Sequence, residues 1–117
     1  MAIASAGDIV LFRFPQTDTL EGKLRPALLV TAIPSKYDDW LVCLISTQFH
    51  QILEDLDDTI DISDADFASS GLKAKSLIRI TRLAVVSESI LLGSTGSIAK
   101  PRLERVRRNI SNWILKG

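Results

Sequence analysis

The chain has 117 residues, which corresponds to one domain, and its 46% hydrophobic and 24% charged residues are typical of a soluble globular protein. Its net charge is zero, and its single cysteine and single histidine exclude an intramolecular disulfide and a zinc site built from Cys and His pairs. The longest apolar run, residues 26–33, is far too short to span a membrane, and the N-terminus lacks the basic residues of an export signal. We therefore expect a single cytoplasmic domain over residues 1–117.

Three apolar runs in the first half of the chain predict β-strands. Residues 9–14 are rich in β-formers and end at Pro15. Residues 27–33 are apolar on both faces, which is typical of a strand in the middle of a sheet. Residues 40–45 form a third buried strand, in which Trp40 is interpreted as a core residue. The polar residues 16–25 predict a loop between the first two strands.

The second half of the chain predicts shorter elements. Alternating polarity at residues 59–63 indicates a half-exposed strand. Residues 64–71 indicate one helical turn that ends at Gly71. Three more short strands are expected, at residues 76–81, 83–86 and 90–92, the last of them before a turn at 93–96.

The last segment changes its hydrophobic period. Pro101 suits a first helical position, and apolar residues then recur at steps of three and four, which predicts an amphipathic helix. The stripe consists of Leu103, Val106, Ile110, Trp113 and Ile114. Several short strands with one terminal helix predict a mainly β (α+β) domain, a small and strongly bent antiparallel barrel.

The zero net charge hides a strong asymmetry along the chain. Residues 37–72 carry nine acidic and no basic side chains, whereas residues 73–117 carry ten basic and two acidic ones. The basic segment can attract phosphate or an acidic peptide. Alternatively, the two segments are solvated faces that neutralise each other across the fold. The charge pattern alone leaves both interpretations open.

The chemical inventory excludes several classes of site. No glycine-rich nucleotide-binding motif is present, and we expect no cofactor. The acidic run at residues 55–66 lacks the mid-loop glycine and the closing glutamate of an EF-hand loop, which argues against calcium. A Ser-His-Asp triad would need His50, which lies in a polar stretch without an obvious orienting acid and is interpreted as a surface residue.

Several short motifs fall at the ends of the expected strands. They are Gly7-Asp8-Ile9-Val10 at the first strand, Arg25-Pro26 entering the second, Ser46-Thr47-Gln48 closing the third and Ser76-Leu77-Ile78-Arg79 on a later strand, followed by the terminal amphipathic helix. Together, over residues 7–114, they resemble the MazF/PemK family, the toxins of type II toxin–antitoxin pairs.

The resemblance implies an SH3-like barrel, a homodimer, inhibition by an antitoxin protein, and metal-independent cleavage of single-stranded RNA. In such cleavage the substrate's own 2′-hydroxyl attacks the adjacent phosphate, so the protein needs a guanidinium and hydroxyl donors around that phosphate. Carried over to this chain, the catalytic residues are Arg25, Ser46 and Thr47, and the substrate-binding residues are Arg79, Gln48, Asp18 and Glu21.

The chain also departs from the family pattern. Thr81 stands where some members have an acidic residue, and one extra residue separates Gly22 from Arg25. The general base is therefore open between Asp18, Glu21 and a phosphate oxygen of the substrate. Two other readings stay open as well: a CcdB-like toxin that binds DNA gyrase through C-terminal aromatic residues such as Trp113, and an inactive binding relative.

Overall fold

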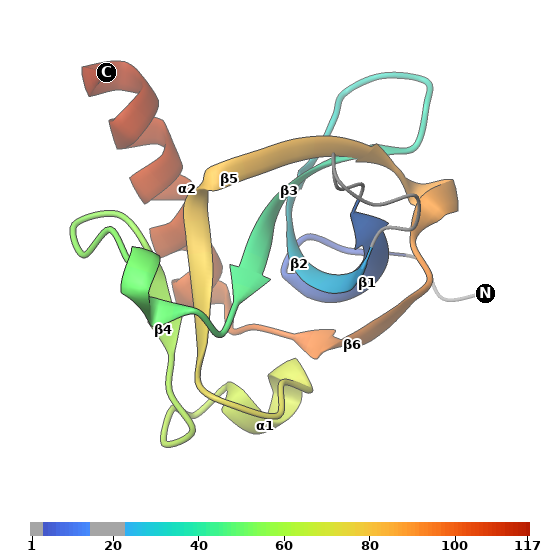
Figure 1. Ribbon diagram of the computed structural model, residues 1–117. Coiled ribbons are helices and arrows are strands. Elements are labelled where there is room, and N and C mark those ends of the chain that lie inside the picture. Colours follow the sequence, from blue (N-terminus) through green and yellow to red (C-terminus); the bar gives the residue numbers. More distant parts are fainter. Residues whose placement is uncertain (1–3, 15–22) are drawn as a thin grey trace.

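The computed structural model describes residues 4–14 and 23–117 (Figure 1). The six strands are β1 (Asp8–Phe14), β2 (Lys23–Ala32), β3 (Asp39–Ser46), β4 (Asp58–Ile60), β5 (Ser76–Ser87) and β6 (Gly93–Ser97). The α-helices are α1 (Phe67–Ser70) and α2 (Lys100–Lys116), and two 3₁₀ turns, η1 (Phe49–Gln51) and η2 (Glu88–Ile90), connect strands.

The strands form one curled antiparallel sheet in the order β4-β5-β3-β2-β1-β6. This confirms the expected mainly β fold with a C-terminal helix, in the form of a half-barrel whose edge strands are β4 and β6. Helix α1 packs against the edge strand β6 (Figure 1). The central position predicted for residues 27–33 is confirmed, because β2 lies between β1 and β3.

Two predictions about strand boundaries were wrong. Residues 23–25, expected in a loop, already belong to β2, because Leu24 and Arg25 pair with Arg13 and Phe12 of β1. The two strands predicted at 76–86 are one strand, β5, which pairs with β3 along most of its length and with β4 at its start.

The prediction for residues 90–96 was also wrong. The expected strand at 90–92 overlaps the 3₁₀ turn η2, and the glycine-rich segment expected as a turn is the edge strand β6. A glycine is required there because a Cβ on Gly96 would lie 2.0 Å from the backbone oxygen of Ser69. Close approach of β6 to α1, rather than a reversal of the chain, explains this glycine.

The sheet is buried on both faces. On one face, Leu103, Val106 and Ile110 of α2 pack against a cluster of aliphatic residues from all of the longer strands, which includes Cys43. Burial raises the pKa of the Cys43 thiol to about 12, so this cysteine is an inert core residue. On the other face, Trp40 packs with Phe12 and neighbouring aliphatic side chains, as expected for a core tryptophan.

The predicted terminal helix is confirmed, with one correction to its apolar stripe. Leu103, Val106 and Ile110 are buried, and Trp113 is half-buried, but Ile114 is 63% exposed because the last helical turn extends beyond the sheet. None of the helices formed by residues 4–14 and 23–117 is both long and apolar enough to cross a membrane.

An arginine-centred cluster joins α2 to the acidic segment. Arg102, only 8% exposed in its side chain, forms ion pairs with Asp58, Asp64 and Asp66, and Arg105 forms one with Asp58. The acidic and basic segments thus neutralise each other across the fold at these residues, but Arg102, Asp58 and Asp66 do so as buried groups and not on the solvated faces that the charge pattern had indicated. These contacts give three carboxylates of the acidic run at residues 55–66 a structural role.

Candidate functional site

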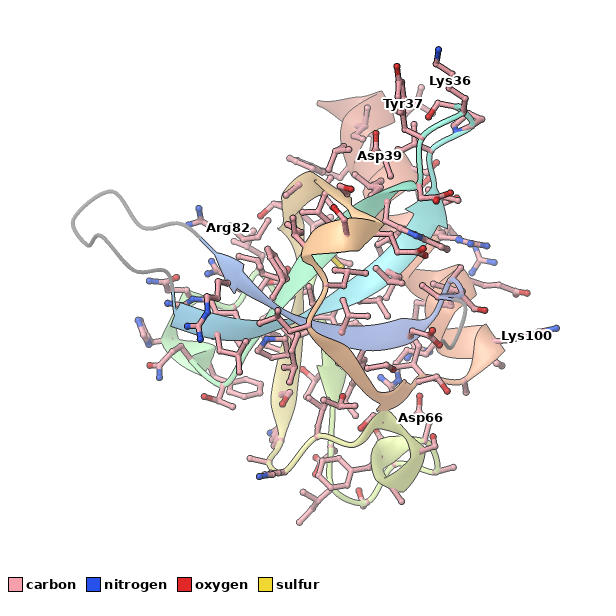
Figure 2. All side chains as sticks on the ribbon, turned by 90° about the vertical axis from the view of Figure 1, so that its right-hand side faces the viewer. Lys36, Tyr37, Asp39, Asp66, Arg82 and Lys100 are labelled. Carbon is pink, nitrogen blue, oxygen red and sulfur yellow. The ribbon has the colours of Figure 1, made fainter. Side chains whose placement is uncertain are left out.

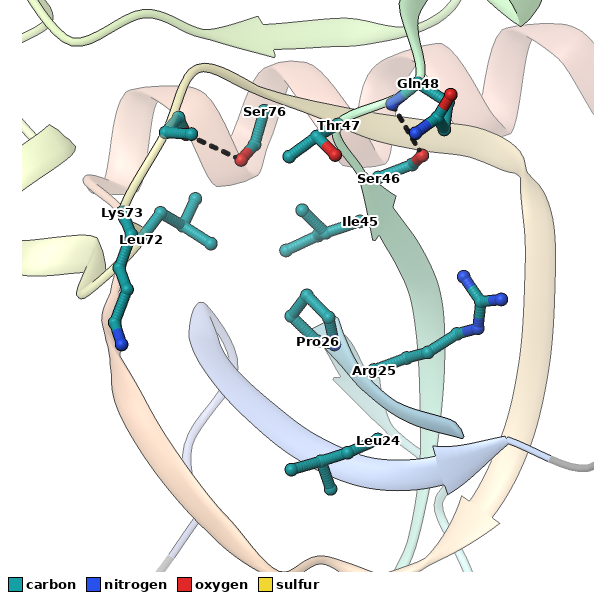
Figure 3. A pocket seen from close by; sticks show the side chains of 11 residues that line it. Leu24, Arg25, Pro26, Ile45, Ser46, Thr47, Gln48, Leu72, Lys73 and Ser76 are labelled. Atoms are coloured by element: carbon teal, nitrogen blue, oxygen red, sulfur yellow. Dashed lines mark hydrogen bonds between the residues drawn. The ribbon is translucent and has the colours of Figure 1, made fainter. Parts of the chain in front are cut away.

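A pocket of about 290 Å³ opens where β2 begins and β3 ends (Figure 3). These two strand ends lie side by side because the strands are antiparallel neighbours. The connection between α1 and β5 forms the other wall. The lining residues are Leu24, Arg25, Pro26, Ile45, Ser46, Thr47, Gln48, Leu72, Lys73, Ala74 and Ser76.

The register of β2 and β3 explains why Arg25 and Ser46 meet in this pocket. Ala27 pairs with Leu44, and Arg25 and Ser46 each lie two residues farther along their strands toward the same end. Side chains two residues apart point to the same face of a strand, so Arg25 and Ser46 share the face of Ala27 and Leu44. Both residues are half-buried, so their side chains can reach solvent while their backbone is held in the sheet.

The hydroxyl of Ser46 is oriented by its own strand end. Its Oγ accepts a hydrogen bond from the backbone N–H of Gln48 at 2.9 Å. A serine hydroxyl has one proton to donate besides its lone pairs, so this bond leaves the Ser46 proton available to a ligand. Ser76 differs, because its Oγ donates to the carbonyl of Ala74 at 2.8 Å and thereby holds the backbone turn.

Among the described lining residues, the charged side chains are Arg25 and Lys73, and both are cationic. Within the described part of the chain, neither side chain has a hydrogen-bond or ion-pair partner. Thr47 and Gln48 are exposed at the rim, beside the half-buried Ser46. Two unpaired cations and several hydrogen-bonding groups make the pocket suitable for an anion.

The structure brings together four of the seven predicted site residues: Arg25, Ser46, Thr47 and Gln48. Arg79 is half-buried on β5 but does not line the pocket, and its Nε is buried without a partner among the described residues. Asp18 and Glu21 lie outside the described residues.

Sequence reasoning missed Lys73 as a lining residue. The element that carries it, the connection at 72–75, follows α1 and reaches the pocket only because β5 pairs with β3. The one local signal was Gly71, which ends α1 in the left-handed conformation with φ 73° and turns the chain toward the pocket.

The remaining candidates lie elsewhere. His50 is an exposed residue in the middle of η1, which confirms its interpretation as a surface residue. In the part of the chain that the structure describes, no group of three or more His, Cys, Asp or Glu side chains is placed to hold a metal ion.

The fold and the pocket thus define a small half-barrel domain with a cationic, hydroxyl-bearing pocket at one edge of its sheet. Residues 5–114 match the family of PemK-like, MazF-like toxins of type II toxin–antitoxin systems, and the chain belongs to this family. No curated protein matches the chain in sequence.

Two solved structures show the same fold. One, an endoribonuclease in complex with its cognate antitoxin from a mycobacterial species, has a TM-score of 0.69 at 11% identity, over 96% of this chain and 95% of that one. The other, the Mycobacterium tuberculosis toxin MazF-mt6, has a TM-score of 0.63 at 18% identity, over 90% and 93% of the two chains.

Proposed function

We propose that this toxin is a metal-independent endoribonuclease that acts in the cytoplasm on single-stranded RNA such as mRNA, with Arg25, Ser46 and Thr47 as its catalytic residues. The observation that carries the proposal is the meeting of Arg25 and Ser46 in one open pocket of a chain from the PemK/MazF family. Both side chains reach a ligand from paired strands, so their spacing is preset by the sheet.

In the proposed reaction, the 2′-hydroxyl oxygen of one nucleotide forms a bond to the adjacent phosphorus, and the bond from phosphorus to the 5′-oxygen of the next nucleotide breaks. The departing 5′-oxygen takes up a proton from water, so the products are a 2′,3′-cyclic phosphate and a free 5′-hydroxyl. The transition state carries extra negative charge on the non-bridging oxygens. The planar guanidinium of Arg25 holds two such oxygens at once and offsets this charge.

The hydroxyl groups complete the phosphate site. The Ser46 Oγ already accepts the Gln48 N–H, so its proton points to another acceptor, and a non-bridging oxygen is the acceptor that the reaction supplies. Thr47 adds a second hydroxyl at the exposed rim. The side chain of Gln48 offers both a donor and acceptor for the edge of a base.

The proton on the attacking 2′-hydroxyl needs an acceptor. The described lining holds no carboxylate, so we keep as candidates Asp18, Glu21 and a phosphate oxygen of the substrate. Arg79 stays a proposed substrate contact: it lies two residues beyond Leu77, the cross-strand partner of Ser46, on the same face of β5.

The proposed partners follow from the family and from the charge of the site. We propose that a cognate antitoxin silences the toxin through a segment with acidic side chains that occupies the cationic pocket, and that the toxin is a homodimer. The related endoribonuclease, whose structure contains its cognate antitoxin, supports an antitoxin as the partner. Static light scattering at micromolar concentration tests the second, and a monomer would overturn it.

The deciding experiment incubates the purified toxin with a long single-stranded RNA in EDTA and maps the ends of the fragments. Cleavage at defined sites, with 2′,3′-cyclic phosphate and 5′-hydroxyl ends, is the expected result. Arg25→Ala should lose most of this activity, whereas Arg108→Ala, which removes an exposed arginine from α2, should retain it. Intact RNA with the wild-type protein, or full activity of Arg25→Ala, would overturn the proposal.

A further inference from the structure

Lys73 stands across the pocket from Arg25. In Figure 3 the Arg25 side chain extends on the side of Ser46 and Gln48, and the Lys73 side chain lies on the opposite side, with Pro26 and Ile45 between them. The two cations therefore belong to different walls: Arg25 to the start of β2, and Lys73 to the connection that precedes β5.

The surface between the two cations is apolar. Pro26, Ile45 and Leu72 line it, and the neighbouring Leu24 is 50% exposed. We call these four residues the apolar floor. A nucleotide has the matching pattern, since a flat base with an apolar face lies between two charged phosphates along the strand. An apolar floor with a cation on each side therefore fits one nucleotide with the phosphates that flank it.

The backbone that carries Lys73 is held in place from both ends. The N–H of Leu72 donates to the Ser70 Oγ at 3.1 Å, and the Ser76 Oγ donates to the Ala74 carbonyl. Gly71 lies against β6 so closely that a Cβ there would be 2.0 Å from the backbone oxygen of Thr95. These contacts fix the direction from which Lys73 enters the pocket.

The same connection is joined to the opposite rim of the pocket. The ammonium of Lys75 lies over the ring of Phe49, 5.1 Å from its centroid, and Phe49 follows Gln48 directly in the chain. Lys75 is thus occupied by an aromatic ring outside the pocket lining, whereas Lys73 lines the pocket without a partner among the described residues. Two lysines of one short connection therefore have different roles.

We propose that Lys73 binds the phosphate adjacent to the scissile phosphate, with the intervening base on the apolar floor. This inference rests on the proposed cleavage of RNA and names a further substrate-binding residue for it. Lys73 acts here as a point charge that anchors the strand and aligns the scissile phosphate on Arg25.

The first test measures how binding depends on salt. The probe is a mixed-sequence single-stranded RNA that is 2′-O-methylated throughout and so cannot be cleaved. Each phosphate contact in a single strand contributes about 0.7 to the slope of log K against log salt, so Lys73→Met should lower that slope by about 0.7 and weaken binding about fivefold at roughly 0.1 M salt.

Two matched variants serve as controls. Lys75→Met removes the same charge from the same connection, and its apolar chain still covers Phe49. Lys36→Met removes a lysine that lies over Tyr37 in the β2–β3 connection, at the far end of the two strands that form the pocket (Figure 2). Both controls should keep a slope closer to that of the wild type than Lys73→Met does.

The second test locates the phosphate. In an oligonucleotide built around a mapped cleavage site, 2′-deoxy at the attacking nucleotide blocks the reaction, and an uncharged methylphosphonate replaces each neighbouring linkage in turn. At one of the two linkages adjacent to the scissile one, the replacement should weaken binding of the wild type about fivefold and leave Lys73→Met unchanged.

The outcomes separate this inference from the function on which it rests. Two results would overturn the Lys73 contact while cleavage of RNA by the wild type still supports the nuclease. One is a salt slope for Lys73→Met equal to that for Lys36→Met. The other is that every methylphosphonate weakens RNA binding by Lys73→Met as much as it weakens binding by the wild type. If the wild type binds the methylated RNA with the Lys73-dependent slope but cleaves none, the nuclease falls and the contact to RNA phosphate remains. A wild type that neither binds nor cleaves RNA overturns both.

Discussion

Arg102 holds both carboxylate oxygens of Asp66, with its Nε 2.8 Å from Oδ2 and its Nη2 2.9 Å from Oδ1. The remaining N–H groups of the guanidinium donate to Asp58, Asp64 and the carbonyl of Thr59. Five hydrogen bonds thus match the five N–H groups of an arginine. This side chain joins α2 to β4 and to the segment that leads into α1.

Arg102→Met should destabilise the fold strongly. It keeps most of the side-chain volume but leaves the buried carboxylates of Asp58 and Asp66 without their main cation, and breaking a buried ion pair in this way costs about 3–5 kcal/mol. Urea unfolding would measure the loss. Arg108→Met, at an exposed position of the same helix, should change the free energy of unfolding by about 0.5 kcal/mol or less.

The same cluster predicts how stability depends on pH. The hydrogen bonds from Arg102 lower the pKa of Asp66 below its usual value of 3.8, and a hydrogen bond from the backbone of Asp61, with a further one from Arg102, lowers that of Asp64. A carboxyl with a lowered folded-state pKa contributes stability above its unfolded pKa and loses it as pH falls through the folded value.

Stability should therefore decrease as the pH falls below 3.8, since Asp66 and Asp64 then bind protons more readily in the unfolded chain. Urea unfolding midpoints measured across this pH range would show how steeply stability falls. Asp66→Asn removes one of the two groups, so this variant should be less stable at neutral pH and should lose less stability as the pH decreases. A decrease as steep as that of the wild type would contradict the role of Asp66.

Arg25 should matter for catalysis and little for folding. Arg25→Ala should lower kcat/KM about 10²- to 10³-fold, the usual effect of removing one group that stabilises transition-state charge. Arg25→Lys keeps the charge but loses bidentate geometry and should recover only part of the activity. Neither change should lower thermal stability much, because Arg25 has no ion-pair partner among the described residues.

Ser46 should act through its hydroxyl proton. Ser46→Ala should raise the transition-state free energy by about 1.5–3 kcal/mol, the range for a hydrogen bond to a charged group, whereas Ser46→Thr should retain most activity. Ser111→Ala is the control, since that serine is exposed on α2 and does not line this pocket. Rates of RNA cleavage under single-turnover conditions compare the variants. Equal losses from Ser46→Ala and Ser111→Ala would contradict the role of the Ser46 hydroxyl.

Elements with a strong hydrophobic period, or with a clear glycine or proline at their ends, were predictable from the sequence. The apolar runs of β1, β2 and β3, the helical stripe of α2 and the glycine that ends α1 all follow from local patterns, and the structure confirms them. Arg25 and Ser46 could be named in advance only through the resemblance of their motifs to the MazF/PemK family. The structure brings them together because antiparallel pairing places the start of one strand beside the end of its neighbour.

The remaining elements and contacts depend on how distant parts of the chain pack together. Arg82 interrupts the apolar pattern of β5 and lies at a shift in its register with β3, and pairing with β3 on both sides of this shift makes the segment one strand. The segment of β6 is a strand because β1 pairs with it, and its Gly96 is needed where α1 lies in contact. Likewise, Lys73 enters the pocket and Arg102 meets the acidic segment through contacts between residues far apart in the chain. Such contacts depend on how the sheet curls, which no local pattern of residues encodes.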